Sequence, residues 1–434
     1  MPDDAAARAL LRETYDDYRR FVNPSLARVM RLSGTPVAVS ALGTEIVDQS
    51  GRRLLDFAGG YGTFSLGHRH PRVVAAVEAQ LREIALSPKT TFDPLAGRLA
   101  RRLAEIAPGD CEVSFFANSG GEAIEAALKL AAAATGRSRI VATDDGYHGK
   151  TLGALAASGA EAYRAPFAAL LAPVTHVPFG DAAALAGALE AGDVAAFVVE
   201  PVQGEGGVNV PPLGYLAEAR RLCDETGTLL VVDEVQTGLG RCGYLFACER
   251  DGVVPDVVTL AKGLSGGVVP IGVAIACRAA WDRAYASRPL LHSSTFGGSP
   301  LACAAALAAL DVTRDERLVE RARDRGAHLL AGARRIAARY PEVVAEARGL
   351  GLLVGLELTS EGYGGAIVAE MLRRGVTTAW TLNRQRVLRL EPPLIVIEAE
   401  IDVALAALRA SVEAALACLG DRGSSSAAAL VAEA

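Results

Sequence analysis

The chain has 434 residues, a hydrophobic fraction of 51% and a formal net charge of −6. A chain of this length usually folds into more than one domain, with ample material for a large buried core. The acidic balance argues against a nucleic-acid-binding protein, which needs a basic patch or stripe. No uncharged apolar stretch is long enough to span a membrane, so no membrane protein is expected.

The first segment and the cysteines point to the cytoplasm. Residues 1–20 are acidic and lack the basic and then apolar plan of a secretory signal. The seven cysteines are scattered without a CxxC pair, which favours buried thiols in a reducing compartment. A zinc site built from Cys242 and Cys248 is the alternative interpretation of two of them.

The pattern of apolar runs predicts an α/β protein. Residues 1–67 read as a helix followed by short strands and turns, and residues 68–311 alternate short apolar runs with helical patterns. The clearest runs are 139–145, 195–202, 229–235 and 256–264. Because they lack polar alternation, they predict strands buried on both faces of a mostly parallel sheet.

The last third of the chain has a different character. An Arg/Ala-rich helix after residue 312 is followed by strand patterns in 344–358 and 387–394, which predicts a smaller α+β domain over 312–420. The tail 421–434 has few large apolar side chains and is predicted to be disordered.

Polar segments stand where several of the predicted strands end. They are 144–150, 200–207, 233–241 and 261–267. Ligands of open α/β sheets bind beyond the carboxyl ends of the strands. The sequence therefore predicts a site at which these four segments meet.

Lys262 is one of only four lysines among 44 basic residues. Arginine cannot lose its proton under ordinary conditions, so a position that stays lysine can be one that needs a neutral amine. Lys262 follows the apolar run from Asp256, and burial there lowers the pKa of an amine and frees its lone pair. A surface lysine in a glycine-rich turn is the alternative.

Asp233 ends an apolar strand, where an acid is costly unless it meets a cation or several hydrogen-bond donors. A protonated pyridine nitrogen would be such a partner. A helix cap or turn former is the alternative. Two residues further along, Val235 can press on one face of a ring, and Gln236 can donate to a phenolic oxygen of that ring.

The segment 115–131 reads as strand, tight turn and helix. Ser119 is a good N-cap, and Glu122 completes a capping box three residues later. The backbone N–H groups of Gly120 and Gly121 at the start of the helix suit a phosphate. An ordinary capped helix without a ligand is the alternative.

Tyr147 and His148 follow the run 139–145. An aromatic side chain at the end of a strand can stack on a flat cofactor ring, although packing is the commoner reason for one. For His68 and His70, turn and capping roles are preferred over metal binding, and no metal site is predicted.

Glu205 and Arg389 form the last candidate pair. The guanidinium of Arg389 can clamp a carboxylate through two hydrogen bonds. A buried guanidinium without a partner is costly, so a nearby glutamate can cover it when no acid is bound. The sequence alone does not show that these two side chains touch.

With these residues identified, the chain resembles the class III (ω-amino) pyridoxal-phosphate-dependent aminotransferases over roughly residues 20–420. The segments that carry the resemblance are NSGGEAIEAALKLA, YHGKTLGAL, EPVQGEGG, VVDEVQTGLGR, TLAKGLSGG and HSSTFGGSPLACAAALA. It implies pyridoxal phosphate (PLP) as the cofactor. It also implies the PLP fold type I, with a large domain over 68–311 and a smaller domain built from 1–67 and 312–420.

The resemblance implies a role for each residue that matches a family motif. Lys262 matches the lysine that forms a Schiff base with the cofactor, and Asp233 the partner of the pyridine nitrogen. The other implied cofactor contacts are Ser119, Gly120, Gly121, Tyr147, His148, Glu200, Val235 and Gln236. Thr295 matches a threonine that reaches the phosphate of the other subunit, which implies a homodimer with shared sites. Whether dimers pair into tetramers stays open.

Within the class, the chain looks most like the putrescine (diamine) aminotransferases, on stretches such as GYLFACER and TLNRQRVLRLEPPL. Glu205 and Arg389 match a Glu/Arg switch that lets one pocket take a cationic amine and then an α-keto acid. The expected reaction is ping-pong transfer of a terminal amino group from a diamine or ω-amino acid to 2-oxoglutarate or pyruvate. The alternatives are an ornithine, acetylornithine or γ-aminobutyrate aminotransferase, an amine-installing enzyme of a natural-product pathway, and an aminomutase.

Two positions depart from the family pattern. Gly121 stands where most relatives have Thr, Ser or Ala, so one side-chain contact to the phosphate is expected to be absent. Tyr61 occupies a substrate-pocket position that is often Phe in diamine enzymes, which leaves the identity of the amino donor open.

Overall fold

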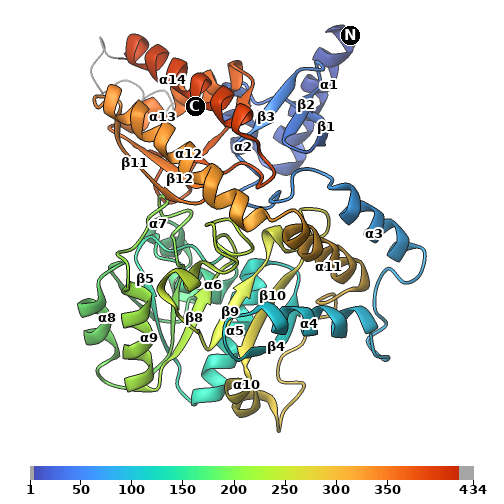
Figure 1. Ribbon diagram of the computed structural model, residues 1–434, viewed down its shortest axis with the longest axis vertical. Helices are drawn as coiled ribbons and strands as arrows, with labels where there is room; N and C mark the ends of the chain where they lie inside the picture. The colour runs from blue at the N-terminus through green and yellow to red at the C-terminus, as the bar shows by residue number, and fades with distance from the viewer. Residues whose placement is uncertain (1–3, 420–434) are drawn as a thin grey trace.

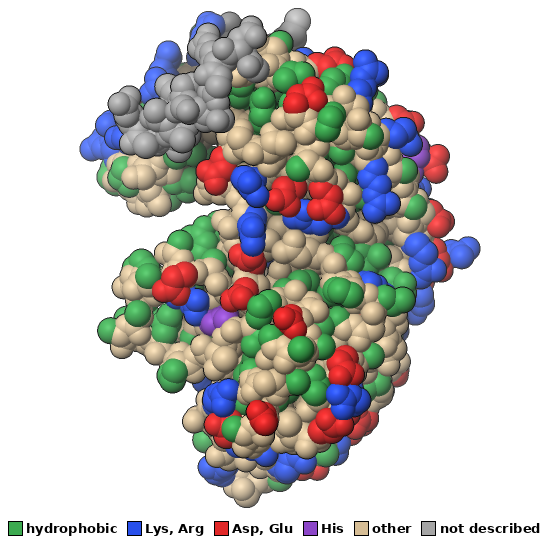
Figure 2. Space-filling model, turned by 90° about the vertical axis from the view of Figure 1, so that its left-hand side faces the viewer, with side chains coloured by type: hydrophobic (Ala, Val, Ile, Leu, Met, Phe, Trp, Pro, Cys, Tyr) green, Lys and Arg blue, Asp and Glu red, His purple; other side chains and the backbone are tan. Residues whose placement is uncertain are grey.

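The computed structural model describes residues 4–419, and the predicted disordered tail 421–434 lies outside this range. The molecule has two parts, one above the other in Figure 1. A seven-stranded sheet lies at the centre of the lower part, and two four-stranded sheets build the upper part. The molecular surface is deeply hollowed between the two parts, as Figure 2 shows.

The large sheet has the strand order β4-β10-β9-β8-β7-β5-β6. Its strands are β4 (Cys111–Ala117), β5 (Arg139–Thr143), β6 (Val174–Val177), β7 (Val194–Val199), β8 (Leu229–Asp233), β9 (Val257–Leu260) and β10 (Gly272–Cys277). The neighbours from β6 to β9 pair in parallel, and β10 runs antiparallel to both β4 and β9. Every residue of β7 and β8 is buried. The prediction of a mostly parallel, two-sided sheet is confirmed.

Helices cover both faces of this sheet. The helices between residues 71 and 315 are α3 (Pro71–Leu81), α4 (Pro94–Ile106), α5 (Gly120–Thr135), α6 (Leu152–Ala157), α7 (Glu161–Arg164), α8 (Ala182–Leu189), α9 (Tyr215–Thr226), α10 (Arg278–Tyr285) and α11 (Pro300–Asp315), with 3₁₀ turns η2 (Ala165–Leu170), η3 (Ala247–Asp251) and η4 (Lys262–Ser265). Of these, α3 packs on α11. Apolar residues of α5 and α10 form the core on one face, and those of α4, α8, α9 and α11 form the core on the other. This double cover explains why the strands are apolar throughout.

The upper part joins the two ends of the chain. One sheet has the order β1-β2-β3-β13 and the other β11-β12-β15-β14. The elements are α1 (Asp4–Asp17), η1 (Tyr18–Val22), α2 (Pro24–Leu32), β1 (Ala38–Leu42), β2 (Glu45–Asp48), β3 (Arg53–Asp56), α12 (Leu318–Arg339), β11 (Val344–Leu350), β12 (Leu353–Leu358), α13 (Glu361–Arg373), β13 (Val376–Thr377), β14 (Ala379–Trp380), β15 (Val387–Leu390) and α14 (Glu398–Leu419). Parallel pairing of β13 with β3 puts both ends of the chain into one sheet. A single core contains Phe57 and Leu66 together with residues from 305 to 415. The division into domains at residues 67, 311 and 420 stays a prediction.

Two details differ from the sequence predictions. The run 256–264 is a strand only as far as Leu260, and Lys262 begins the turn η4. Six of the seven cysteines are buried as free thiols, whereas Cys418 is exposed. Among residues 4–419, no helix combines the length and apolar character needed to cross a membrane.

Candidate active site

The four polar segments of the sequence prediction meet in a cavity of about 840 Å³ beyond the carboxyl ends of β5, β7, β8 and β9. Ten of the predicted site residues line it: Ser119, Gly120, Gly121, Tyr147, His148, Glu200, Asp233, Val235, Gln236 and Lys262. This is the edge of an open α/β sheet at which ligands bind. The structure therefore brings together residues that span more than 140 positions of the sequence.

Lys262 is held in the cavity by an unusual backbone conformation. It has a φ of 44°, in the left-handed region that a side-chain-bearing residue seldom adopts, directly after the buried strand β9. Such strain persists where the surrounding structure enforces it, and it is common at functional sites. Burial lowers the pKa of the Lys262 amine, although the nearby carboxylates of Glu391 and Glu205 oppose that effect. The arrangement favours an amine that can lose its proton.

Asp233 shares its carboxylate between three donors. Its Oδ2 lies 2.7 Å from Nδ1 of His148, and its Oδ1 accepts hydrogen bonds from Thr259 Oγ1 at 3.1 Å and from the N–H of Val235 at 3.0 Å. Burial by itself lowers the pKa of His148, but the hydrogen bond and charge of Asp233 raise it overall. The other ring nitrogen of His148, Nε2, is buried without a partner among the described residues. The carboxylate is thus desolvated and oriented, as a partner for a cation would be.

The start of α5 faces the same cavity. Ser119 accepts a hydrogen bond from the N–H of Glu122 at 3.2 Å, so the predicted N-cap is confirmed. In a capping box, the Glu122 side chain would also accept from the N–H of Ser119. In the structure it accepts instead from the N–H of Asn118 at 2.8 Å. The first N–H groups of a helix have no acceptor inside it, and the helix dipole adds positive potential. Gly120 and Gly121 therefore present an anion site to the cavity.

Glu200 supports the loop that carries Tyr147. Its two carboxylate oxygens accept from the N–H of Tyr147 at 3.0 Å and from the N–H of Gly204 at 3.2 Å. Burial raises the pKa of Glu200 to about 7, because the opposing effect of His148 is smaller and Asp233 adds to the rise.

Arg389 lies between two glutamates. Its Nη1 is 2.6 Å from Oε1 of Glu205, which confirms the contact that the sequence left open, and its Nε is 3.2 Å from Oε2 of Glu391. The guanidinium lies 5.3 Å from the ring centre of Tyr61, and its Nη2 is buried without a partner among the described residues. The arginine is thus compensated on two edges and keeps one free donor.

Glu391 is the site residue that the sequence analysis did not select. It is fully buried, accepts from Gln236 Nε2 at 2.9 and 3.1 Å, and lies 3.7 Å from Nε of the equally buried Arg241. The hydrogen-bond donor that was predicted to serve a ring oxygen is therefore shared with Glu391. The available signal was an acid at the end of an apolar strand, the same signal that selected Asp233.

Four predicted residues lie apart from the cavity lining: Tyr61, Thr295, Glu205 and Arg389. Tyr61 is half exposed and reaches the site through Arg389, with a φ of 58° in a glycine-rich loop. Thr295 is exposed and does not line the cavity of its own chain. The role that the family resemblance implies for Thr295, at the phosphate of a second subunit, stays a prediction.

A family model described as aminotransferase class-III matches residues 32–412. The chain belongs to the class III aminotransferase family. A putrescine aminotransferase from Pectobacterium atrosepticum is 45% identical over 409 residues, which cover 91% of this chain and 87% of that relative.

Solved structures agree with this assignment. An ornithine aminotransferase from Toxoplasma gondii, crystallised with PLP partly occupying its active site, is 34% identical and has a TM-score of 0.83 over 93% of this chain and 97% of its own. An (S)-enantioselective ω-transaminase from Thermomicrobium roseum is 32% identical, with a TM-score of 0.87 over 94% and 99% of the two chains. This aminotransferase thus has the PLP fold type I, and its cofactor is pyridoxal phosphate.

The cavity fits that cofactor. It combines a helix N-terminus suited to a phosphate, a half-buried lysine and a buried carboxylate. A Cβ built at Gly121 would meet nothing closer than 3.6 Å, so the anion site is open at that position. Cation, anion and amine sites within one desolvated space match the groups that a phosphorylated pyridine aldehyde carries.

Proposed function

We propose that this aminotransferase moves a terminal amino group from a putrescine-like diamine or ω-amino acid to an α-keto acid, 2-oxoglutarate or pyruvate, by a ping-pong mechanism. The observation that carries the proposal is the buried contact between Arg389 and Glu205 at 2.6 Å. An arginine covered by a glutamate presents no free charge to a cationic donor, and it is available to a carboxylate once the glutamate moves away. The 45% identity to a putrescine aminotransferase supports the same donor class.

In this proposal the phosphate of the cofactor lies at the start of α5. The N–H groups of Gly120 and Gly121 and the hydroxyl of Ser119 would hold it, because a helix N-terminus presents unpaired donors and positive potential to an anion. Gly121 contributes no side chain to this site.

We expect Gly121→Ser to tighten cofactor binding roughly two- to tenfold, the range of one added hydrogen bond. A Cβ at this position would meet Thr151 Oγ1 at 3.6 Å, an ordinary contact. The matched control is Gly120→Ser, whose Cβ would lie 2.9 Å from Cγ1 of Val235 and should weaken binding. Titration of the two apo-enzymes with PLP measures both constants. Equal affinities of Gly121→Ser and wild type would show that no phosphate contact is missing there.

The ring of the cofactor would lie between Tyr147 and Val235, which both line the cavity. Asp233 would pair with the ring nitrogen, and the hydrogen bond from His148 keeps its carboxylate oriented. Gln236 would donate to the phenolic oxygen with the amide hydrogen that it does not donate to Glu391. Glu200 would hold the Tyr147 loop in place through the N–H of Tyr147.

Pyridoxal phosphate, when bound, supplies an aldehyde that reacts with amines and a ring that accepts the electron pair left when a proton leaves the donor carbon. Lys262 would be the residue that holds the cofactor through its amine between turnovers, and the donor amine would take its place. The freed Nζ would then take the proton from the donor carbon and deliver it elsewhere in the same site. Burial lowers the pKa of this amine, which favours its action as a base.

The two substrates would use Glu205 and Arg389 in turn. With the donor, Glu205 stays on Arg389 and the pocket carries no excess positive charge. With the keto acid, the carboxylate takes the place of Glu205 and can also use the free Nη2 of Arg389. Glu391 keeps its contact to Nε, so the buried guanidinium is not left without a counterion during the exchange.

We also propose a homodimer with shared sites in the cytoplasm. Thr295 would reach the phosphate bound in the second subunit. Phe296 beside it is 58% exposed, and Leu290 and Phe92 are 87% and 105% exposed. Large apolar side chains exposed to this degree are of the kind that a protein interface covers. The free buried thiols support a reducing compartment.

A donor comparison tests the proposed function. Putrescine and butylamine have the same carbon chain and differ in one ammonium group, so we expect kcat/KM with 2-oxoglutarate to be roughly 10- to 100-fold higher for putrescine, the value of one charge-assisted contact. Ornithine, N-acetylornithine and 4-aminobutyrate complete the panel, with pyruvate as the second acceptor. A clear preference for 4-aminobutyrate or ornithine would leave only the ω-amino acid half of the proposal, and turnover of none of these terminal amines would contradict the whole of it.

A further inference from the structure

The turn between β14 and β15, residues 382–386, extends from the upper part of the molecule to the loops of the cavity. We infer that this 382–386 turn is a positioning element that holds Glu205 on Arg389 and thereby sets the preference for cationic over anionic donors, with Asn383 and Arg384 as its anchors. The inference rests on the proposed function and assigns residues to it that have no contact with the cofactor cavity.

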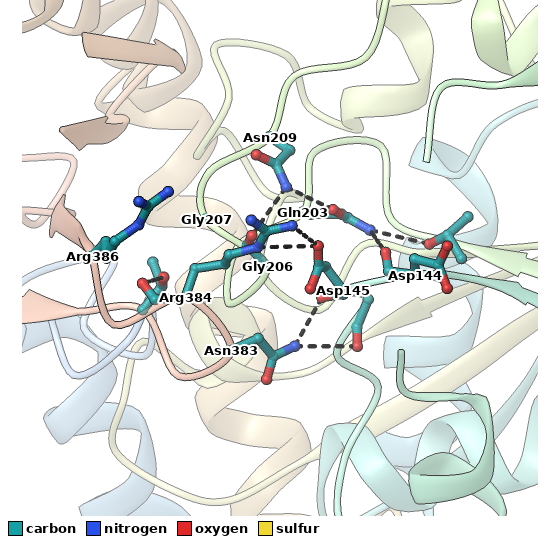
Figure 3. A network of polar contacts seen from close by, with 12 residues as sticks. Asp144, Asp145, Gln203, Gly206, Gly207, Asn209, Asn383, Arg384 and Arg386 are labelled. Carbon is teal, nitrogen blue, oxygen red and sulfur yellow. Dashed lines mark hydrogen bonds and ion pairs between the residues drawn. The ribbon is translucent and has the colours of Figure 1, made fainter. Parts of the chain in front are cut away.

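The turn is attached to the lower part at three points. The hydroxyl of Tyr163 donates to the carbonyl of Leu382 at 3.1 Å, and Nδ2 of Asn383 donates to the carbonyl of Asp145 at 2.8 Å. The guanidinium of Arg384 reaches the Asp145 carboxylate through Nη2 at 2.5 Å and Nε at 3.2 Å. Figure 3 shows Asn383 and Arg384 converging on Asp145 from the same loop. The backbone of the turn is therefore fixed relative to the segment that leads into Tyr147.

The turn, attached in this way, donates two hydrogen bonds to Glu205. The N–H of Leu382 donates to Oε2 of Glu205 at 2.7 Å, and the N–H of Asn383 donates to the carbonyl of Glu205 at 3.0 Å. Glu205 Oε1 is the oxygen that meets Arg389. The glutamate is thus held by one oxygen on the turn and by the other on the arginine, and a charge-assisted bond to a backbone N–H is among the stronger ones.

The loop that carries Glu205 is also hydrogen-bonded to the segment 144–145. Gln203 Nε2 donates to the carbonyl of Asp144 at 2.7 Å, and Asn209 Nδ2 donates to Gln203 Oε1 at 2.9 Å and to the Gly206 carbonyl at 3.0 Å (Figure 3). Both ends of the bond between Leu382 and Glu205 therefore rest on residues 144–145. Releasing Arg384 from Asp145 loosens the turn and leaves the loop 203–209 in place.

Donor selection follows from this geometry. While Glu205 is held on Arg389, the pocket shows no excess positive charge and accepts a diamine. When the bond from Leu382 is weakened, Glu205 leaves Arg389 more often. An uncovered guanidinium repels an ammonium group and attracts a carboxylate. The kcat/KM for diamines then falls, and the kcat/KM for anionic donors rises.

Putrescine and 4-aminobutyrate form the matched pair of donors, since they differ mainly in a terminal ammonium group against a carboxylate. For the holoenzyme carrying Arg384→Gln, we expect the ratio of kcat/KM for putrescine to that for 4-aminobutyrate to fall about five- to tenfold. The Arg384 side chain is 50% exposed, so its replacement leaves the core intact. Arg384→Lys, which keeps the positive charge, should have a donor ratio between those of Arg384→Gln and the wild type. Asp145→Asn should repeat the effect, since asparagine tolerates the φ of 61° at this position.

The control is Arg386→Gln in the same turn. Arg386 is similarly exposed, but it pairs with Glu357 at 2.9 Å and points away from the Asp145 contacts. We expect it to leave the donor ratio unchanged. In a Glu205→Gln background, Arg384→Gln should add no further change in the ratio, because the two act through one bond.

Three results would overturn the inference: an unchanged ratio in Arg384→Gln, an equal fall for both donors, or an independent effect in the Glu205→Gln background. These are distinct from a failure of the proposed function. A wild-type enzyme that uses neither donor would refute both. A wild-type enzyme that prefers putrescine, together with an Arg384→Gln variant that prefers it equally, would refute the inference alone.

Discussion

Replacing Lys262 with alanine is expected to lower turnover by at least roughly 10⁴-fold, because one side chain is assigned both the covalent and the proton-transfer role. The structure supports this expectation through position and environment. Lys262 lines the cavity at the end of β9 in a strained left-handed conformation, and burial lowers the pKa of its amine. No hydroxyl or guanidinium can replace a neutral amine that forms an imine.

The measurement is kcat with putrescine and 2-oxoglutarate at saturating PLP, together with the visible absorption band of the bound cofactor. Lys262→Arg is the second variant to measure, since the arginine side chain keeps the positive charge but cannot give up its proton. It should be as inactive as the alanine variant. Lys129→Ala, at an exposed position on α5, should keep both activity and the absorption band. Turnover above one hundredth of wild type in Lys262→Ala or Lys262→Arg would be incompatible with the proposed function.

Local pattern was sufficient to predict the large sheet. The runs that became β7 and β8 are apolar throughout, and this property follows directly from burial on two faces. Pattern could not predict where β9 ends, because Ala261 and Leu264 continue the apolar run while the backbone turns at Lys262 with a φ of 44°. That conformation is enforced by the surrounding structure and leaves no mark in the residue types.

The sequence predicted several cavity residues that follow strands, but it missed Glu391, which also follows a strand, and the contact between Asp145 and Arg384. Asp233 and Lys262 stand at strand ends, and both line the cavity beyond the sheet. Glu391 comes 155 residues after its hydrogen-bond partner Gln236, and Arg384 comes 239 residues after Asp145. Side-chain pairs of this kind depend on how the two parts of the molecule pack together. Composition and periodicity do not contain that information.

Replacing Asp233 with asparagine tests the second half of the proposed site. The substitution keeps the shape of the side chain and removes its charge, so the cofactor's ring nitrogen would lose its anionic partner. Breaking a buried charge pair costs about 3 to 5 kcal/mol. If that energy is realised in the transition state, kcat falls roughly one hundred- to several thousand-fold. Single-turnover rates with putrescine at saturating PLP measure the effect on the donor half-reaction.

The contacts of Asp233 supply a control that separates charge from packing. Thr259→Val removes the 3.1 Å hydrogen bond to Oδ1 and keeps the carboxylate, so the loss should stay within about 1.5 kcal/mol, or roughly tenfold. If Thr259→Val matched Asp233→Asn, orientation of the carboxylate would matter more than its charge. If Asp233→Asn kept nearly full activity, the carboxylate would serve only His148. The bond from His148 Nδ1 at 2.7 Å would then be a structural contact, and the cation that Asp233 is proposed to stabilise would have to be assigned elsewhere in the cavity.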